Sequence, residues 1–268
     1  MPSATPYEYS GIPRTGFYVA ALLIAYQNPN ALMQVNHYHA LRRMDHLQDG
    51  QDDMAQFLHS EARSSQRGIE IPPLGLKGTL STPSNAHSLV VFVHGSGSSR
   101  LSPCNVAVAA LKEPGTAPLL FDLLLPEEEV NRANVFDIEF LSQRLIDVLR
   151  WTGRETVLSR PPLGLFGAST GAAAALVGAA SEIPCVRAVV SRGGRPDLPG
   201  HALGRIKAAT LLIVGGNDHG VIELNQAGLP AAKAHKCADR CRRHSSVRGT
   251  GALQLVTAQA AQWFEAHL

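Results

Sequence analysis

The segment "GLFGASTGAAAAL" (residues 164–176) decides the fold of this 268-residue chain. A short apolar run leads into Gly-Ala-Ser-Thr-Gly, and an alanine-rich segment follows that we predict to be a helix over residues 170–180. A serine on a sharp strand-to-helix turn requires that Gly167 and Gly171 lack side chains, because strand and helix must approach closely. The pattern therefore predicts a reactive Ser169 hydroxyl on such a turn, in preference to a helix start with an incidental serine.

From about residue 68 onward the chain repeats short apolar runs, turns rich in Gly, Ser and Asp, and amphipathic or alanine-rich segments. This alternation predicts an α/β fold with a mostly parallel central sheet and helices on both faces. Several runs are apolar on both faces, as is typical of central strands covered by helices. The predicted strands are 75–80, 88–93, 117–122, 163–166, 186–191 and 209–214, and the predicted helices are 137–151, 170–180 and 252–268.

Composition limits the classes of partner. With 45% hydrophobic and 17% charged residues the chain can bury one well-packed core. A formal net charge of +2 gives no basic field for nucleic acid, and four cysteines are too few for a disulfide framework. The first residues lack the order of charged, apolar and small residues of a signal peptide. We expect a cytoplasmic monomer or homodimer that binds neither nucleic acid nor membrane.

Residues 1–67 depart from the α/β alternation. Clusters of Pro, Tyr and Asn precede segments that contain Met and His, without the order of strand, turn and helix. We predict an N-terminal extension of unknown role over residues 1–67 and one α/β domain over residues 68–268.

A second glycine-rich loop follows the predicted strand within "VVFVHGSGSSR" (residues 90–100). Backbone amides of such a loop can approach a substrate carbonyl, and the helix after Ser169 directs its first N–H groups to the same space. We predict that the backbone N–H groups of Ser96 and Thr170 form an oxyanion hole. A phosphate-binding loop is the alternative, but no G-K-[ST] follows and the loop lacks lysine. His94 is expected to shape the loop.

An acidic residue follows the predicted strand 209–214 in "GGNDHGVIELN" (residues 215–225). Asp218 lies at the carboxyl end of that strand, where catalytic groups collect in open α/β sheets, and it follows Ser169 in the chain. We predict Asp218 as the catalytic acid; it is also a candidate helix cap, and Asp197 is the alternative acid. Three arginines on loops at this edge are candidate ligands for a substrate carboxylate, with capping or salt-bridging roles as the alternative: Arg100, Arg192 and Arg195.

Five segments resemble a bacterial branch of the dienelactone hydrolase-like α/β-hydrolases: "VVFVHGSGSSRLSP", "LLFDLLLPEEE", "LGLFGASTGAAAAL", "AVVSRGGRPDL" and "LLIVGGNDHGVIELN". The resemblance covers residues 68–268. Dienelactone hydrolase proper is described by a cysteine nucleophile, whereas this chain has Ser169, which indicates serine ester hydrolysis. The resemblance implies a Ser-His-Asp triad that cleaves small carboxylic esters or lactones without metal or organic cofactor. A catalytically impaired binding protein, a thioesterase and a peptidase are the alternatives.

By resemblance, the catalytic histidine belongs to a loop such as G-A-T-H-L-F-E-E-P after the last strand. Here that region reads "RRHSSVRGT" (residues 242–250), and no apolar last strand is recognisable between residues 228 and 241. If the written chain folds, His244 is the candidate base, with a surface histidine as the alternative. Zinc is a further alternative, because His235, Cys237, Cys241 and His244 are of zinc-ligand types. In a helix, Cys237, Cys241 and His244 would share one face.

The genetic code offers an explanation for this departure. Codons that spell Cys241 to Gly251 also spell A-G-A-T-H-L-F-E-E-P when they are read one nucleotide out of step. We infer that roughly residues 228–250 are an out-of-frame reading of the expected strand and histidine loop. Nucleotide sequence across this stretch is expected to contain the loop in a second frame. Clean base calls in the written frame, with no such loop in another frame, would overturn the inference.

Overall fold

The computed structural model describes residues 65–102, 105–106, 109, 115–155, 161–183, 186–215, 218–228, 236–241 and 250–268. The chain divides into two compact units, residues 1–57 and residues 58–268. The predicted N-terminal extension lies outside the described residues up to residue 64, and the first strand begins at Ser65.

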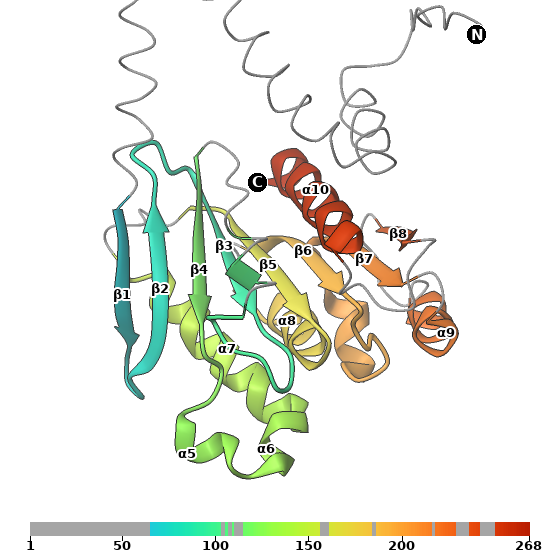
Figure 1. The fold of residues 1–268 in the computed structure, drawn as a ribbon, viewed down its shortest axis with the longest axis horizontal. Coiled ribbons are helices and arrows are strands. Elements are labelled where there is room, and N and C mark those ends of the chain that lie inside the picture. The colour runs from blue at the N-terminus through green and yellow to red at the C-terminus, as the bar shows by residue number, and fades with distance from the viewer. Residues whose placement is uncertain are drawn as a thin grey trace, which may run out of the picture. The chain divides into compact units, whose positions relative to one another are not determined.

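An eight-stranded sheet forms the centre of the second unit, in the order β1-β2-β4-β3-β5-β6-β7-β8 (Figure 1). The pairs β1/β2 and β2/β4 are antiparallel, and all other neighbours are parallel. The predicted α/β class and mostly parallel sheet are confirmed, and each predicted strand is present to within about two residues. The strands are β1 (Ser65–Ile71), β2 (Leu76–Thr82), β3 (Ser88–Val93), β4 (Thr116–Phe121), β5 (Leu163–Ala168), β6 (Val186–Arg192), β7 (Ala209–Gly215) and β8 (Lys236–Cys241).

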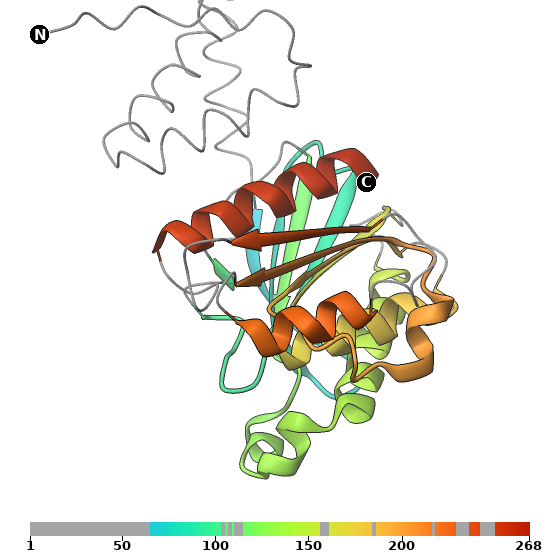
Figure 2. The same ribbon diagram turned by 90° about the vertical axis from the view of Figure 1, so that its right-hand side faces the viewer.

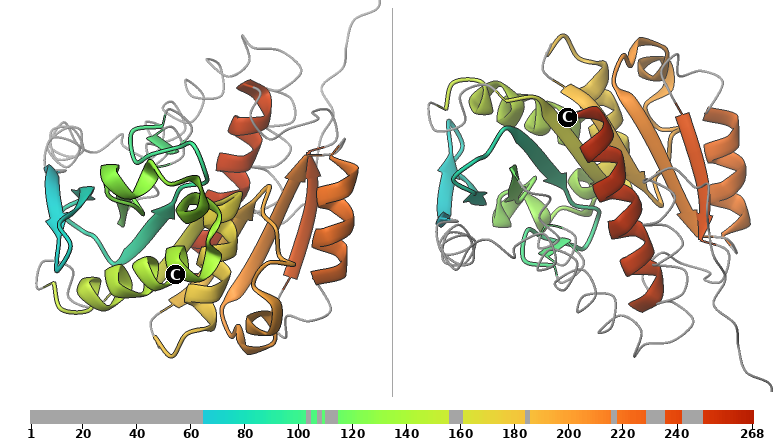
Figure 3. Two further views of the ribbon diagram at one scale, coloured as in Figure 1. Left: turned by 90° about the horizontal axis from the view of Figure 1, so that it is seen from below. Right: turned by 90° about the horizontal axis from the view of Figure 1, so that it is seen from above.

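Helices cover both faces of the sheet, with α10 on one face and α7, α8 and α9 on the other (Figures 2 and 3). The three predicted helices correspond to α7, α8 and α10, whereas α5, α6, α9 and the 3-10 helix η2 were not among the predicted elements. No helix in the described part of the chain is long and apolar enough to cross a bilayer. The helices are α5 (Pro126–Glu129), α6 (Arg132–Phe136), α7 (Ile138–Thr152), α8 (Thr170–Ala180), η2 (Gly200–Arg205), α9 (His219–Gly228) and α10 (Thr250–His267).

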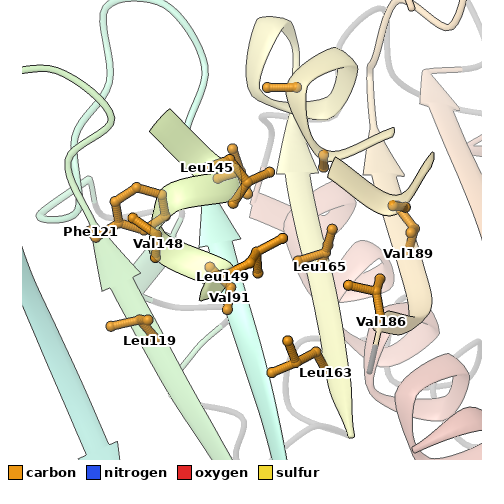
Figure 4. Close-up of a cluster of buried hydrophobic side chains, with 14 of the residues drawn as sticks. Val91, Leu119, Phe121, Leu145, Val148, Leu149, Leu163, Leu165, Val186 and Val189 are labelled. Carbon is orange, nitrogen blue, oxygen red and sulfur yellow. The ribbon is translucent and has the colours of Figure 1, made fainter. Parts of the chain in front are cut away.

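Two hydrophobic clusters explain why the central strands are apolar on both faces. On β3, Val91 belongs to the cluster that contains the buried side chains of α7 and α8, while Val90 and Phe92 belong to the cluster that contains those of α10. Leu145 and Leu149 of α7 lie against this first face of the sheet (Figure 4). Successive residues of a strand point to opposite faces, so a strand covered twice needs apolar residues at every position.

The strand order reverses at β3, and this reversal positions the site. The chain runs from β3 to β4 on one side and then returns to place β5 on the other side of β3. Val93 of β3 is the parallel partner of Gly167 of β5. The loops that follow these residues therefore leave the sheet side by side, at the kind of switch point where open α/β sheets form ligand crevices.

The last strand forms although its sequence, KCADRC, is not apolar. β8 pairs with β7 in parallel, with Cys237 opposite Leu211, and lies at the edge of the sheet. Charged side chains are common on edge strands, where they discourage pairing with another chain. Cys237 and Cys241 therefore lie on a strand, so the helical face assumed for zinc is not formed there; His235 and His244 lie outside the described residues.

We expect Gly171→Ala to lower the free energy of unfolding by about 3 kcal/mol or more, because overpacking against backbone is not relieved by rotamer changes. A Cβ on Gly171 would lie 2.3 Å from the carbonyl oxygens of both Val93 and His94. Gly220→Ala in α9 is the matched control, since its Cβ would meet nothing within 4 Å. Urea unfolding followed by circular dichroism measures both variants, and equal stability of the two would contradict this packing.

Candidate active site

Ser169 occupies the turn between β5 and α8 in a backbone conformation that side chains rarely adopt. Its φ is 53° and its ψ is −122°, and it is the single non-glycine with positive φ among the described residues. Its N–H donates to the carbonyl oxygen of Arg192 (3.2 Å), and its own carbonyl accepts from the N–H of Ala172 (3.1 Å). The side chain is half-buried. The predicted strand, sharp turn and helix are therefore present around this serine.

Three glycines allow the backbone segments to meet at Ser169. A Cβ on Gly167 would lie 2.5 Å from the α-carbon of Ala172, so β5 and α8 could not approach as they do with any larger residue. The same role was predicted for Gly171. Gly95 was not predicted to have it, yet its Cβ would lie 3.0 Å from the Cβ of Ser169. The loop after β3 thus contacts the serine directly, a contact that follows from strand order and not from local spacing.

The loop after β3 is a tight turn that points toward the start of α8. The N–H of Ser98 donates to the carbonyl oxygen of Gly95 (3.2 Å), and Gly97 has a φ of +65°, as the third residue of such a turn requires. The N–H of Ser96 donates to Oγ1 of Thr170 (3.0 Å). The two predicted oxyanion donors therefore lie next to each other. Here the Ser96 N–H is held by a hydroxyl, which a substrate oxygen would have to replace or share.

His94 joins the loops that follow β3 and β4. Its Nε2 accepts a hydrogen bond from the N–H of Leu123 (3.0 Å), so the proton of the neutral ring is on Nδ1, which donates to the carbonyl oxygen of Gly95 (3.1 Å). The residue is buried, with 6% of its surface exposed. Because both ring nitrogens are engaged, His94 shapes the loop, as predicted.

Two of the three candidate arginines are paired with neighbouring carboxylates. The backbone N–H of Arg100 donates to Oδ1 of Asp122 (2.8 Å), and its guanidinium forms an ion pair with the same carboxylate. Arg195 donates two hydrogen bonds to Asp197 (2.8 and 2.7 Å). These bonds lower the pKa of Asp197 and raise the pKa of Arg195. Arg192 is buried at the carboxyl end of β6.

Asp218 directly precedes α9 and caps it. Its carboxylate accepts from the N–H of Val221 (3.4 Å), and its carbonyl oxygen accepts from the N–H of Ile222 (2.8 Å). The side chain is half-buried. The carboxylate of Asp197, by contrast, receives two bonds from Arg195, which favours Asp218 as the partner of an imidazole. The predicted base, His244, lies outside the described residues.

A cavity of about 630 Å³, which we call the elbow cavity, adjoins the turn at Ser169. Gly95, which contacts Ser169, is among its lining residues, together with both predicted oxyanion donors. One wall carries hydroxyl groups and another is apolar. Its described lining residues are His94, Gly95, Ser96, Gly97, Ser98, Ser99, Leu101, Ser102, Leu123, Leu124, Glu129, Val135, Leu141 and Thr170.

No sequence pattern predicts that residues 123–141 form a wall of this cavity, because they are far from Ser169 along the chain. The only local signal was Pro126 followed by three glutamates, which indicates a helix start. Nothing in that signal predicts that Glu129 faces a cavity.

We expect Thr170→Val to lower the free energy of unfolding by about 1–3 kcal/mol, because it leaves the N–H of Ser96 without its hydroxyl partner in a partly buried place. Thr170→Ser keeps the hydroxyl and should retain most of the stability. Urea unfolding of the three proteins measures the difference. Valine and serine variants of equal stability would show that the Ser96 bond contributes nothing.

Comparison with known proteins identifies the family. No profile of a known protein family matches the chain. The crystal structure of dienelactone hydrolase from Anabaena variabilis is 43% identical in sequence, with a TM-score of 0.73. The match covers 77% of this chain and 98% of that protein. Est1E from Butyrivibrio proteoclasticus, at 16% identity and a TM-score of 0.60, covers 76% of this chain and 98% of its own, and shows the same fold.

Two curated proteins of Mycobacterium tuberculosis, from strains CDC 1551 and H37Rv, are 52% identical over 214 residues. Both carry a provisional phosphoribosyl transferase name. The match covers 77% of this chain but only 47% of each of them, so the chain spans about half the length of these relatives. The Anabaena protein is 43% identical to this chain, shares its fold and is covered almost completely. The chain therefore belongs to the dienelactone hydrolase family of the α/β-hydrolases.

Proposed function

We propose that this protein is a serine hydrolase that cleaves carboxylic esters or lactones through an acyl-enzyme. The observation that carries the proposal is the positive φ of Ser169 on the turn between β5 and α8, beside the glycine loop after β3. That conformation costs energy and persists only where surrounding contacts hold it, and it presents a serine at the start of a helix. Membership of the dienelactone hydrolase family supports the same reaction class.

In the proposed first step, Oγ of Ser169 attacks the carbonyl carbon while His244 accepts the hydroxyl proton. Asp218 orients the imidazole and stabilises its charged form. The carbonyl oxygen becomes an oxyanion that accepts hydrogen bonds from the N–H groups of Ser96 and Thr170. When the tetrahedral intermediate collapses, the bond to the alcohol oxygen breaks, and the alcohol leaves with the proton from His244.

Water then attacks the acyl group on Ser169, with the same histidine as base, and releases the carboxylic acid. The protons move between side chains, substrate and water, so the steps call for no metal or organic cofactor. If residues 228–250 are read out of frame, the histidine of A-G-A-T-H-L-F-E-E-P takes the role of His244. A small-molecule ester is the proposed substrate in either case.

Our proposal does not assign the phosphoribosyl transferase activity named for the mycobacterial relatives to this chain. That name describes proteins of which this chain covers less than half, whereas the strand-to-helix turn at Ser169 lies within the chain. A thioesterase or peptidase would use the same residues, and a panel of thioesters and peptides separates these from an esterase. A catalytically impaired binding protein would react with none of them.

We expect a fluorophosphonate probe to label the protein covalently at Ser169, since it requires an activated serine but no particular substrate. Mass spectrometry of the proteolysed adduct locates the modified peptide. Ser169→Ala should abolish labelling and lower kcat for p-nitrophenyl butyrate by about 10³-fold or more. Ser191→Ala is the matched control, a serine at the end of the neighbouring strand β6 that is 0% exposed.

The same probe distinguishes the candidate acids. Asp218→Asn should slow labelling by about 10²-fold or more, and Asp197→Asn by less than about 3-fold, because only the first would orient the imidazole. A folded wild-type protein that resists the probe would contradict the hydrolase proposal. Equal labelling of wild type and Ser169→Ala would contradict the choice of nucleophile.

A further inference from the structure

Among the described residues that line the elbow cavity, the one side chain with a formal charge is that of Glu129. This residue ends α5 and is exposed. His94 also lines the cavity, but both of its ring nitrogens are engaged, by the N–H of Leu123 and the carbonyl oxygen of Gly95. The cavity that adjoins Ser169 therefore presents a carboxylate to whatever enters it.

Three arginines lie near this wall; Arg132 of α6 lies with its guanidinium 6.0 Å from the ring centroid of Phe136, and the other two are paired with carboxylates. Arg100, on the loop after β3, is bound to Asp122. Arg144 of α7 forms an ion pair with Glu128, the neighbour of Glu129 in α5, and its guanidinium lies 4.7 Å from the ring centroid of Phe140. Neither guanidinium is available to an entering anion without giving up a partner that is itself partly buried.

The segment that builds the wall is acidic as a whole. Residues 122–144 contain six carboxylates and two arginines, a formal charge of −4, although the whole chain carries +2. Charges of one sign around a cavity concentrate their field inside it, because the protein wall has a low dielectric constant. The formal charge of this segment is therefore opposite in sign to that of the whole chain, and Glu129 brings one of its carboxylates to the cavity.

We propose that the elbow cavity receives an uncharged or cationic part of the ester substrate and excludes an anionic one; this rests on the proposed hydrolase function. An entering carboxylate would lose hydration and face Glu129, and no cationic side chain is among the described lining residues. A neutral polar group, in contrast, can exchange hydrogen bonds with the hydroxyl groups of Ser98 and Ser102, while apolar atoms contact Leu123 and Leu124. The substrate class is thus neutral or basic esters of mixed polar and apolar character.

Pairs of esters that differ in one charge test this selectivity. The first pair carries the charge on the acyl side, p-nitrophenyl hexanoate against mono-p-nitrophenyl adipate. The second carries it on the alcohol side, 4-carbamoylphenyl acetate against 4-carboxyphenyl acetate, followed by chromatography. We expect wild type to favour the neutral ester of at least one pair by about 10-fold in kcat/KM, and that pair identifies which side of the ester enters the cavity.

The dependence on Glu129 is the decisive comparison. Glu129→Gln should reduce the neutral-to-anionic ratio by about 5-fold, the factor expected for two unit charges about 4 Å apart in water, and Glu129→Lys should reduce it further. Glu127→Gln is the matched control, another glutamate of α5 that is outside the described lining of the cavity, and it should leave the ratio within about 2-fold. Raising the salt concentration should shrink the wild-type ratio.

Failure of the charge selectivity and failure of the hydrolase function give different results. If the protein hydrolyses the neutral and anionic esters of both pairs with ratios that Glu129→Gln does not change, the charge selectivity is wrong while the hydrolase proposal stands. If no ester is cleaved above the uncatalysed rate and Ser169 is not labelled, the hydrolase proposal fails and this inference fails with it.

Discussion

The close approach of α8 to β3 is the constraint on which the rest of the site depends. Gly171 lies against the backbone oxygens of Val93 and His94, at a distance that leaves no room for a Cβ. With α8 held there, Ser169 must reverse the chain within one residue, and it does so at a positive φ. Such a conformation costs about 1–3 kcal/mol, which the packing of sheet and helix has to supply.

Hydrogen bonds between loops extend this arrangement beyond the turn. His94 ties the loop after β3 to Leu123, and Arg100 ties the same loop to Asp122, so two contacts join the loops that follow β3 and β4 into one unit. Ser96 ties that unit to Thr170 at the start of α8. The elbow cavity is bounded by these same loops, so its shape and its negative wall follow from contacts that also hold the oxyanion donors.

The central strands and the turn at Ser169 could be predicted, because buried parallel strands read as apolar runs and the turn needs glycines at fixed spacing. β8 could not, since its polar sequence becomes a strand only through pairing with β7. The bond between Ser96 and Thr170 joins residues 74 positions apart, and Glu129 reaches the cavity through helix packing. Local patterns carry no information on such contacts, which arise when distant elements assemble.

The most direct test of the account is a crystal structure of the protein with a phosphonate bound covalently to Ser169. The account predicts that the phosphoryl oxygen lies about 3 Å from the backbone nitrogens of both Ser96 and Thr170, with the φ of Ser169 still positive. A negative φ at Ser169, or a phosphoryl oxygen that contacts neither nitrogen, would contradict it.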